Sequence, residues 1–144
     1  DFLNSLKQAF TLEITNTKCK PTFNHRFAMR QLKEEGYKIA VCSNSVKVSI
    51  ETMMRLSGLL PYIDLILSNE DVNAGKPSPE IYLKAMSLFK LKASECLILE
   101  DNDHGIQAAI ASRGHLFKID TPDDVTHRAI MDKITLISNF EREE

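Results

Sequence analysis

The sequence lacks the features that mark several large classes of protein. Its 144 residues contain 18 Lys and Arg against 20 Asp and Glu, so no basic excess points to a nucleic-acid partner. No apolar run is long enough to cross a bilayer, and no signal-peptide pattern opens the chain. We therefore expect neither a nucleic-acid nor a membrane partner.

Cysteine is scarce as well. The three cysteines are odd in number and show no CxxC spacing, which argues against a disulfide framework or a zinc site. Reduced thiols in a cytoplasmic protein fit better. Cys42 and Cys96 lie in apolar runs and are predicted to be small core residues. A redox role for Cys42 stays open, because this residue directly precedes a candidate site.

What the chain does have is an alternation of short apolar runs with helical patterns. Strands of this kind, bounded by Gly, Asn, Asp or Ser, are typical of a parallel sheet that is buried on both faces. The predicted strands are Tyr37–Cys42, Ile63–Leu67, Cys96–Leu99 and His115–Ile119, with a short fifth at Ile134–Ile137. A further helical piece, Leu3–Phe10, opens the chain. The alternation predicts an α/β fold with helices on both faces of the sheet.

Apolar residues at helical spacing fill the gaps between these strands. Ser78 is predicted to cap one helix, with Pro79 at its first position. The predicted apolar stripes are Phe23, Phe27, Ala28 and Leu32; Val46, Ile50, Met53 and Met54; Tyr82, Ala85, Met86 and Phe89; and Ile106, Ala109 and Ile110.

Ligands of parallel α/β sheets bind beyond the carboxyl ends of the strands, so the residues that follow each strand are the candidates for a site. Ser43-Asn44-Ser45 follows the first predicted strand and precedes a helix. A hydroxyl and backbone N–H groups in that place can bind an anion. Ser and Asn are also favoured helix caps, and the stretch alone leaves both interpretations open.

Lys76 follows the second predicted strand, between Gly75 and Pro77. A lysine there could neutralise anionic groups as a compact point charge. A Gly-Lys-Pro turn with a solvated lysine is the alternative. If the lysine turns inward, we expect a cis peptide bond between Lys76 and Pro77, since X–Pro bonds adopt the cis form far more readily than other peptide bonds.

Glu100 and Asp101 emerge directly from the third predicted strand. Two carboxylates at a strand end suit Mg²⁺, which binds carboxylate oxygens and keeps water ligands that a phosphate can replace. The alternative is helix capping by Asp101, Asn102 or Asp103. Asp103 is interpreted as a surface or capping acid, and His104 is a minor candidate for contact with the site.

Taken together, these motifs resemble the haloacid dehalogenase-like hydrolase superfamily, in its branch of β-phosphoglucomutase and sugar-phosphate phosphatases. The resemblance covers about Pro21–Phe140 and rests on "EEGYKIAVCSNS", "GKPSPEIYLKA" and "LILEDNDHGIQAA". It implies a Rossmann-like three-layer α/β/α core. It also implies that Ser43, the Asn44 N–H and Lys76 bind the phosphoryl group, and that Glu100 and Asp101 hold Mg²⁺.

The family's first motif, an Asp-x-Asp after the central strand that supplies the nucleophile, has no match before residue 43. Residues 1–20 resemble the end of a helical cap with its linker. Residues 21–144 are predicted to form the core without its first strand. Either the sequence is partial, or the two strands beside the gap pair directly, or another chain completes the sheet.

We expect the chain to be a fragment of a Mg²⁺-dependent phosphatase or phosphomutase. The expected substrate is a small phosphorylated metabolite, specifically a sugar phosphate. The fragment alone is expected to be inactive, because the aspartate that would form the aspartyl-phosphate is absent. A non-catalytic phosphate-binding or regulatory module is the alternative. A receiver-like or nucleotide-binding domain is disfavoured, since no Gly-rich phosphate loop occurs.

Overall fold

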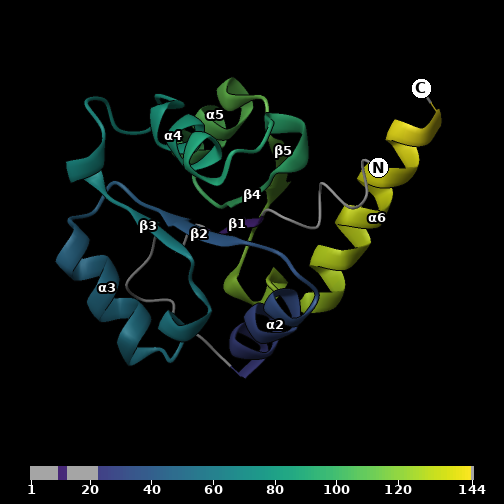
Figure 1. Ribbon diagram of the computed structural model, residues 1–144, viewed down its shortest axis with the longest axis horizontal. Coiled ribbons are helices and arrows are strands. Elements are labelled where there is room, and N and C mark those ends of the chain that lie inside the picture. Colours follow the sequence, from purple (N-terminus) through teal and green to yellow (C-terminus); the bar gives the residue numbers. More distant parts are fainter. Residues whose placement is uncertain (1–9, 13–22, 144) are drawn as a thin grey trace.

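A computed structural model describes residues 10–12 and 23–143 of the chain. It shows a five-stranded parallel sheet in the order β3-β2-β1-β4-β5 (Figure 1). The strands are β1 (Phe10–Leu12), β2 (Ile39–Cys42), β3 (Leu65–Leu67), β4 (Leu97–Glu100) and β5 (His115–Lys118). The helices are α2 (Phe23–Glu34), α3 (Lys47–Leu56), α4 (Glu80–Phe89), α5 (Asp103–Ser112) and α6 (His127–Glu143). The predicted α/β class is confirmed.

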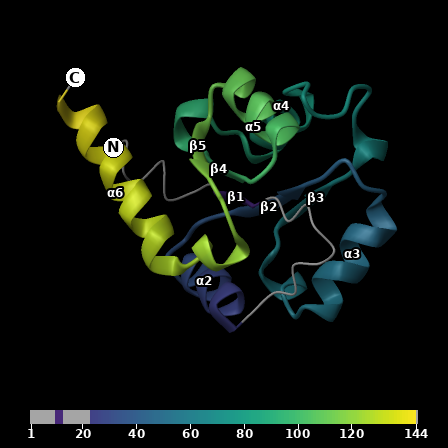
Figure 2. The same ribbon diagram turned by 180° about the vertical axis from the view of Figure 1, so that it is seen from behind.

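Helices cover both faces of the sheet, as Figures 1 and 2 show from opposite sides. Successive residues of a strand point to opposite faces, and β2 illustrates the division. Ile39 and Val41 pack into a core with α2, α3 and α6, whereas Ala40 and Cys42 pack into a second core with α4 and α5. The continuous apolar runs in the sequence therefore reflect strands that are buried on both sides.

The centre of the sheet corrects the prediction of a missing strand. Phe10–Leu12 forms β1, which pairs in parallel with β2 on one side and with β4 on the other. Strand edges inside a domain carry N–H and C=O groups that need partners, and this short segment supplies them. The expected helix over Leu3–Phe10 is wrong at Phe10, and residues 3–9 lie outside the described residues. The assignment of residues 1–20 to a cap and linker is wrong for residues 10–12, which belong to the core sheet, and stays a prediction for residues 1–9 and 13–20.

The predicted fifth strand at Ile134–Ile137 is wrong, because these residues lie within α6. Ile130, Ile134 and Ile137 are buried at helical spacing, while Leu136 is 62% exposed. A run of four apolar residues is too short to show whether its hydrophobic period is that of a strand or of a helix. Here the packing of α6 beside α2 favours the helix.

Truncation of α6 side chains should distinguish a helix from a strand at this position. We expect Ile134→Ala to lower the free energy of unfolding by about 2–4 kcal/mol, because it removes buried methyl groups and leaves a cavity. Leu136→Ala should change it by less than about 0.5 kcal/mol. In a strand both residues would lie on one face. Urea unfolding of the two variants measures the difference, and equal losses would contradict the helix.

Two predicted details at helix surfaces also change. Ala28 and Leu32 of the predicted α2 stripe are buried, together with His25 and Met29, but Phe23 and Phe27 are 72% and 44% exposed. In α5, Ile110 is 62% exposed, and Ala108 and Ala109 face the sheet. Small alanines let the helix approach the strands closely.

The cysteine prediction is confirmed for the two cysteines that the structure describes. The side chains of Cys42 and Cys96 are both buried. Burial, together with the negative charge of Glu95, raises the pKa of Cys96 to about 12, so this side chain stays a protonated core residue. Among the described residues, no helix combines the length and the apolar character that a membrane span requires.

Candidate active site

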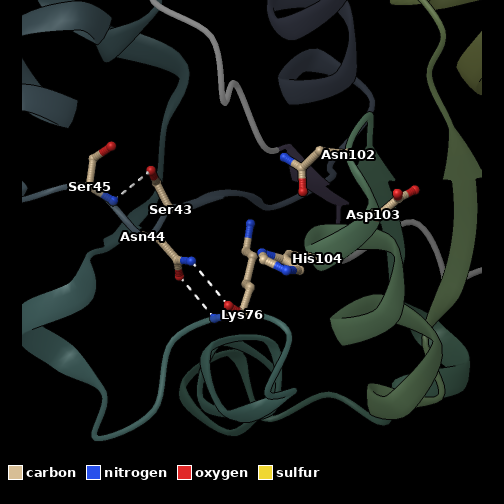
Figure 3. Close-up of a pocket in the computed structure, with 7 residues that line it drawn as sticks. All are labelled: Ser43, Asn44, Ser45, Lys76, Asn102, Asp103 and His104. Carbon is tan, nitrogen blue, oxygen red and sulfur yellow. Dashed lines mark hydrogen bonds between the residues drawn. The ribbon is translucent and has the colours of Figure 1, made fainter.

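A pocket of about 480 Å³ lies beyond the carboxyl ends of β2 and β4 (Figure 3). Three predicted residues line it, namely Ser43, Asn44 and Lys76. Its wall also contains Ser45, Asn102, Asp103 and His104. The structure thus brings together residues that are up to 61 positions apart in the sequence, from Ser43 to His104. Asp103 is exposed, as expected of a surface acid, and it also lines the pocket. His104 contacts the pocket as well, which was a minor expectation.

Ser43 follows β2 and is almost fully buried, with 5% of its surface exposed. Its N–H donates to the carbonyl of Leu67 in β3 at 3.0 Å, and its Oγ accepts a hydrogen bond from the N–H of Ser45 at 3.1 Å. The capping alternative is wrong, because α3 begins only at Lys47 and has Val46 as its N-cap. A buried hydroxyl in a pocket wall can still donate its own proton to an anion.

Lys76 points inward, and the solvated-turn alternative is wrong. Only 4% of its side chain is exposed. Its Nζ donates to the carbonyl oxygen of Cys42 at 2.8 Å and to Oε2 of Glu100 at 2.7 Å. The Lys76–Pro77 peptide bond is cis, as predicted. The ammonium group therefore lies between the end of β2 and the end of β4.

Tyr82 of α4 supports this ion pair and was missed by the sequence analysis, which treated it as a core residue only. Its hydroxyl donates to the same Oε2 of Glu100 that receives Lys76. The Lys76 ammonium also lies 4.9 Å from the centre of the Tyr82 ring, a distance typical of a cation–π contact. The apolar periodicity placed Tyr82 correctly, but the hydroxyl was the signal that a buried polar partner must exist.

Glu100 is fully buried, and its carboxylate occupies the space beside Gly105. A Cβ atom added to Gly105 would lie 2.1 Å from Oε1 of Glu100 and 2.3 Å from Oε2. The first turn of α5 can pass this close to the strand end only because residue 105 has no side chain.

Gly105→Ala should therefore destabilise the protein, although alanine normally stabilises a helix by about 1 kcal/mol relative to glycine. We expect a loss of about 2–4 kcal/mol in the free energy of unfolding, because the methyl group displaces a buried carboxylate. Thermal or urea unfolding measures the effect. Gln107→Ala, at an exposed position of the same helix, is the matched control and should be nearly neutral. A gain in stability for Gly105→Ala would contradict the packing described above.

At the start of α5, the residue that caps the helix is not one of the two predicted metal ligands. Asn102 is the N-cap, and its Oδ1 accepts a hydrogen bond from the N–H of Gly105 at 2.8 Å. Asp101 is exposed and is not the cap. Neither Glu100 nor Asp101 lines the pocket, and Lys76 stands between the pocket and Glu100.

The donor set at the end of β4 fits Mg²⁺ in its chemistry. Oε1 of Glu100 is buried and has no hydrogen-bond partner among the residues that the structure describes. Asp101 adds a second carboxylate directly beyond it. No group of three metal-binding side chains gathers anywhere in the described part of the chain. Water and phosphate oxygens would have to supply the other ligands, as is common for Mg²⁺.

Comparison with protein families gives a match over residues 1–116 to the model described as haloacid dehalogenase-like hydrolase. An uncharacterized protein of Haemophilus influenzae is 31% identical over 120 residues, which are 83% of this chain and 58% of that protein. The bifunctional riboflavin kinase/FMN phosphatase of Arabidopsis thaliana is 28% identical, with 88% of this chain and 33% of that protein covered. Pyrophosphatase PpaX of Bacillus cereus is 35% identical over 78 residues, covering 54% of this chain and 36% of that protein.

Solved structures show the same fold. The β-phosphoglucomutase of Clostridium difficile superposes with a TM-score of 0.69 at 18% identity, covering 85% of this chain and 59% of that chain. A putative β-phosphoglucomutase from Thermotoga maritima gives 0.66 at 21% identity, with 85% and 60% covered. An uncharacterized protein from Corynebacterium glutamicum gives 0.70 at 14% identity, with 92% and 96% covered.

This chain spans between a third and three fifths of the length of the three curated relatives described above. The family match nevertheless extends over most of its residues, and the strand order and the pocket at the strand ends agree with it. The chain belongs to the haloacid dehalogenase-like hydrolase family.

Proposed function

We propose that this chain is the core of a Mg²⁺-dependent phosphatase or phosphomutase that acts on a small phosphorylated metabolite, with a sugar phosphate as the expected substrate. The observation that carries the proposal is the meeting of Ser43, Asn44 and Lys76 in one pocket at the carboxyl edge of the sheet. A hydroxyl, a backbone N–H and an ammonium group suit a phosphoryl group, which presents several anionic oxygens.

The chain's own residues would bind and orient the phosphoryl group. The Ser43 hydroxyl and the Asn44 N–H would donate hydrogen bonds to its oxygens, and the Lys76 ammonium would neutralise their charge. Glu100 and Asp101 would hold Mg²⁺, which supplies Lewis-acid stabilisation of the charge that develops on those oxygens. Burial of Lys76 and Glu100 keeps water from screening this arrangement.

The proposed nucleophile is an aspartate that this chain does not contain in the required motif. It would come from a segment outside this sequence, which would have to bring the aspartate to the pocket although β1 of this chain already fills the centre of the sheet, and it would form the aspartyl-phosphate. The absence of an Asp-x-Asp after a strand also supports a second candidate, a non-catalytic phosphate-binding module. The sequence upstream of Asp1 in the parent separates the two, since an Asp-x-Asp after an apolar run supports the enzyme. The buried thiols Cys42 and Cys96 suit a reducing compartment, and we propose a cytoplasmic location.

The metal assignment is tested by magnesium titration in the presence of a phosphate mimic such as orthovanadate. We expect Asp101→Ala to weaken Mg²⁺ binding by at least about tenfold, because it removes one of two carboxylate ligands. Calorimetry on the wild type and the variant measures the change. Asp123→Ala, which removes a carboxylate from the short helix at Pro122–Asp124, is the control and should leave the affinity unchanged. Equal affinities in Asp101→Ala and the wild type would remove Asp101 from the metal site.

A further inference from the structure

The side chain of Asn44 holds the main chain of Lys76, a contact that lies outside the role proposed for the Asn44 backbone. Oδ1 of Asn44 accepts a hydrogen bond from the N–H of Lys76 at 3.0 Å. Nδ2 of Asn44 donates to the carbonyl oxygen of Lys76 at 3.3 Å. Figure 3 shows both bonds as a pair of parallel dashed lines between the two residues. One amide thus satisfies both polar main-chain groups of the lysine.

Gly75 makes room for this amide. A Cβ atom added to Gly75 would lie 2.9 Å from Oδ1 of Asn44, 3.2 Å from Cγ and 3.4 Å from Nδ2. The plane of the amide therefore rests against the α-carbon of the residue before Lys76. The backbone angles of Gly75 do not require glycine, since its φ is not in the left-handed region. Space for Asn44 is the physical reason for a glycine at this position.

The two ends of Lys76 are held by different elements. Its ammonium group contacts the Cys42 carbonyl, the Glu100 carboxylate and the Tyr82 ring, which belong to β2, β4 and α4. Its main chain is held by Asn44, which follows β2. The loop after β3 is thereby tied to the loop after β2, where Ser43 lies. A fixed distance between Ser43 and Lys76 is what a pocket for one phosphoryl group needs.

From these contacts we infer that Asn44 is a positioning residue: its side-chain amide locks the Lys76 loop onto the Ser43 loop, so that hydroxyl and ammonium face the same anion. The inference rests on the proposed function for the identity of the anion. The lock itself rests only on the contacts between Asn44, Gly75 and Lys76.

The test uses Asn44→Ala, which removes the amide but keeps the backbone N–H that is proposed to bind phosphate. Lys76 reactivity toward an acetylating reagent, measured by peptide mass spectrometry, reports whether the lysine stays buried. We expect Lys76 of the variant to react at least about fivefold faster than in the wild type, while Lys33 keeps its rate. Inorganic phosphate should bind about 5- to 150-fold more weakly, which is the range for two neutral hydrogen bonds.

Two further variants make the result specific. Gly75→Ala should reproduce both effects, because its methyl group displaces the amide, and the double variant should be no weaker than the stronger single variant. Asn69→Ala is the matched control: Asn69 is exposed, and its backbone N–H bond to the Ser45 carbonyl remains in the variant. This control should match the wild type in both measurements.

The outcomes distinguish this inference from the proposed function. An unchanged Lys76 rate in Asn44→Ala overturns the inference, whether or not phosphate binds. A faster Lys76 rate without any phosphate binding to the wild type supports the lock and overturns the proposed function. If Lys33 also reacts faster in Asn44→Ala, the variant has unfolded and Gly75→Ala decides; failure of that variant to accelerate Lys76 alone overturns the inference.

Discussion

Lys76→Met should lower the free energy of unfolding by about 3–5 kcal/mol, which is the usual effect of removing one partner from a buried ion pair. The side chains of Lys76 and Glu100 are 4% and 0% exposed, and their charged atoms lie 2.7 Å apart. Methionine fills a similar volume but leaves the Glu100 carboxylate with the Tyr82 hydroxyl and without a counter-charge. Loss of the ammonium should also abolish measurable phosphate binding in the pocket.

Urea unfolding of three variants separates charge burial from loss of packing. The double variant Lys76→Met/Glu100→Gln should recover much of the stability, because it removes the unpaired buried charge. Lys33→Met is the matched control, since its partner Asp64 lies 2.6 Å away but both side chains are about a third exposed. This control should lose no more than about 1 kcal/mol. If Lys76→Met were as mild as Lys33→Met, the ion pair would not be a central element of the site.

The 144-residue chain by itself should hydrolyse phosphate esters orders of magnitude more slowly than the same chain joined to its native upstream segment. Ser43, Lys76, Glu100 and Asp101 can bind and neutralise a phosphoryl group, but the proposed nucleophile is absent. Positioning and electrostatics without a nucleophile leave only residual catalysis.

The comparison is made with p-nitrophenyl phosphate and Mg²⁺ on both forms of the protein. A panel of sugar phosphates, FMN and pyrophosphate on the longer form tests the proposed substrate class, because two relatives are named for FMN and pyrophosphate hydrolysis. Sugar phosphates should give the highest kcat/KM. Comparable turnover by the two forms would falsify the assignment of the nucleophile to a missing aspartate. The search would then turn to Ser43, Asp101 and Glu13, which is the first residue after β1 in the sequence.

Local sequence was a good guide where one signal acted alone. The runs ending at Cys42, Leu67 and Leu99 became strands within two residues of their expected bounds, because an apolar segment with polar flanks has few other ways to be buried. Placement of polar residues after these strands followed from the rule that parallel strands end at one edge of the sheet. Ser43, Asn44 and Lys76 could therefore be named as neighbours from the sequence.

Prediction from local sequence was wrong where a segment is compatible with both a strand and a helix. Ile134–Ile137 suits a strand or a helix, and contact of Ile134 with the core around α2 selected the helix. Phe10 fits the end of a predicted apolar helical stripe. It forms a strand because β2 and β4 both have backbone groups at this position that need hydrogen-bond partners. In both cases the deciding energy came from residues distant in the chain, which no local window contains.

The sequence by itself determined the α/β class, the parallel strands and the residue types available for a phosphate pocket. Only the tertiary structure decided how those residues are held. Lys76 pairs with Glu100, the ring of Tyr82 contacts the Lys76 ammonium, and the Asn44 side chain bonds the main chain of Lys76. The reason is physical. Periodicity records which residues leave water, and that is a property of local segments. Buried polar groups must instead find specific partners, and their partners here lie 18 to 34 residues apart in the chain.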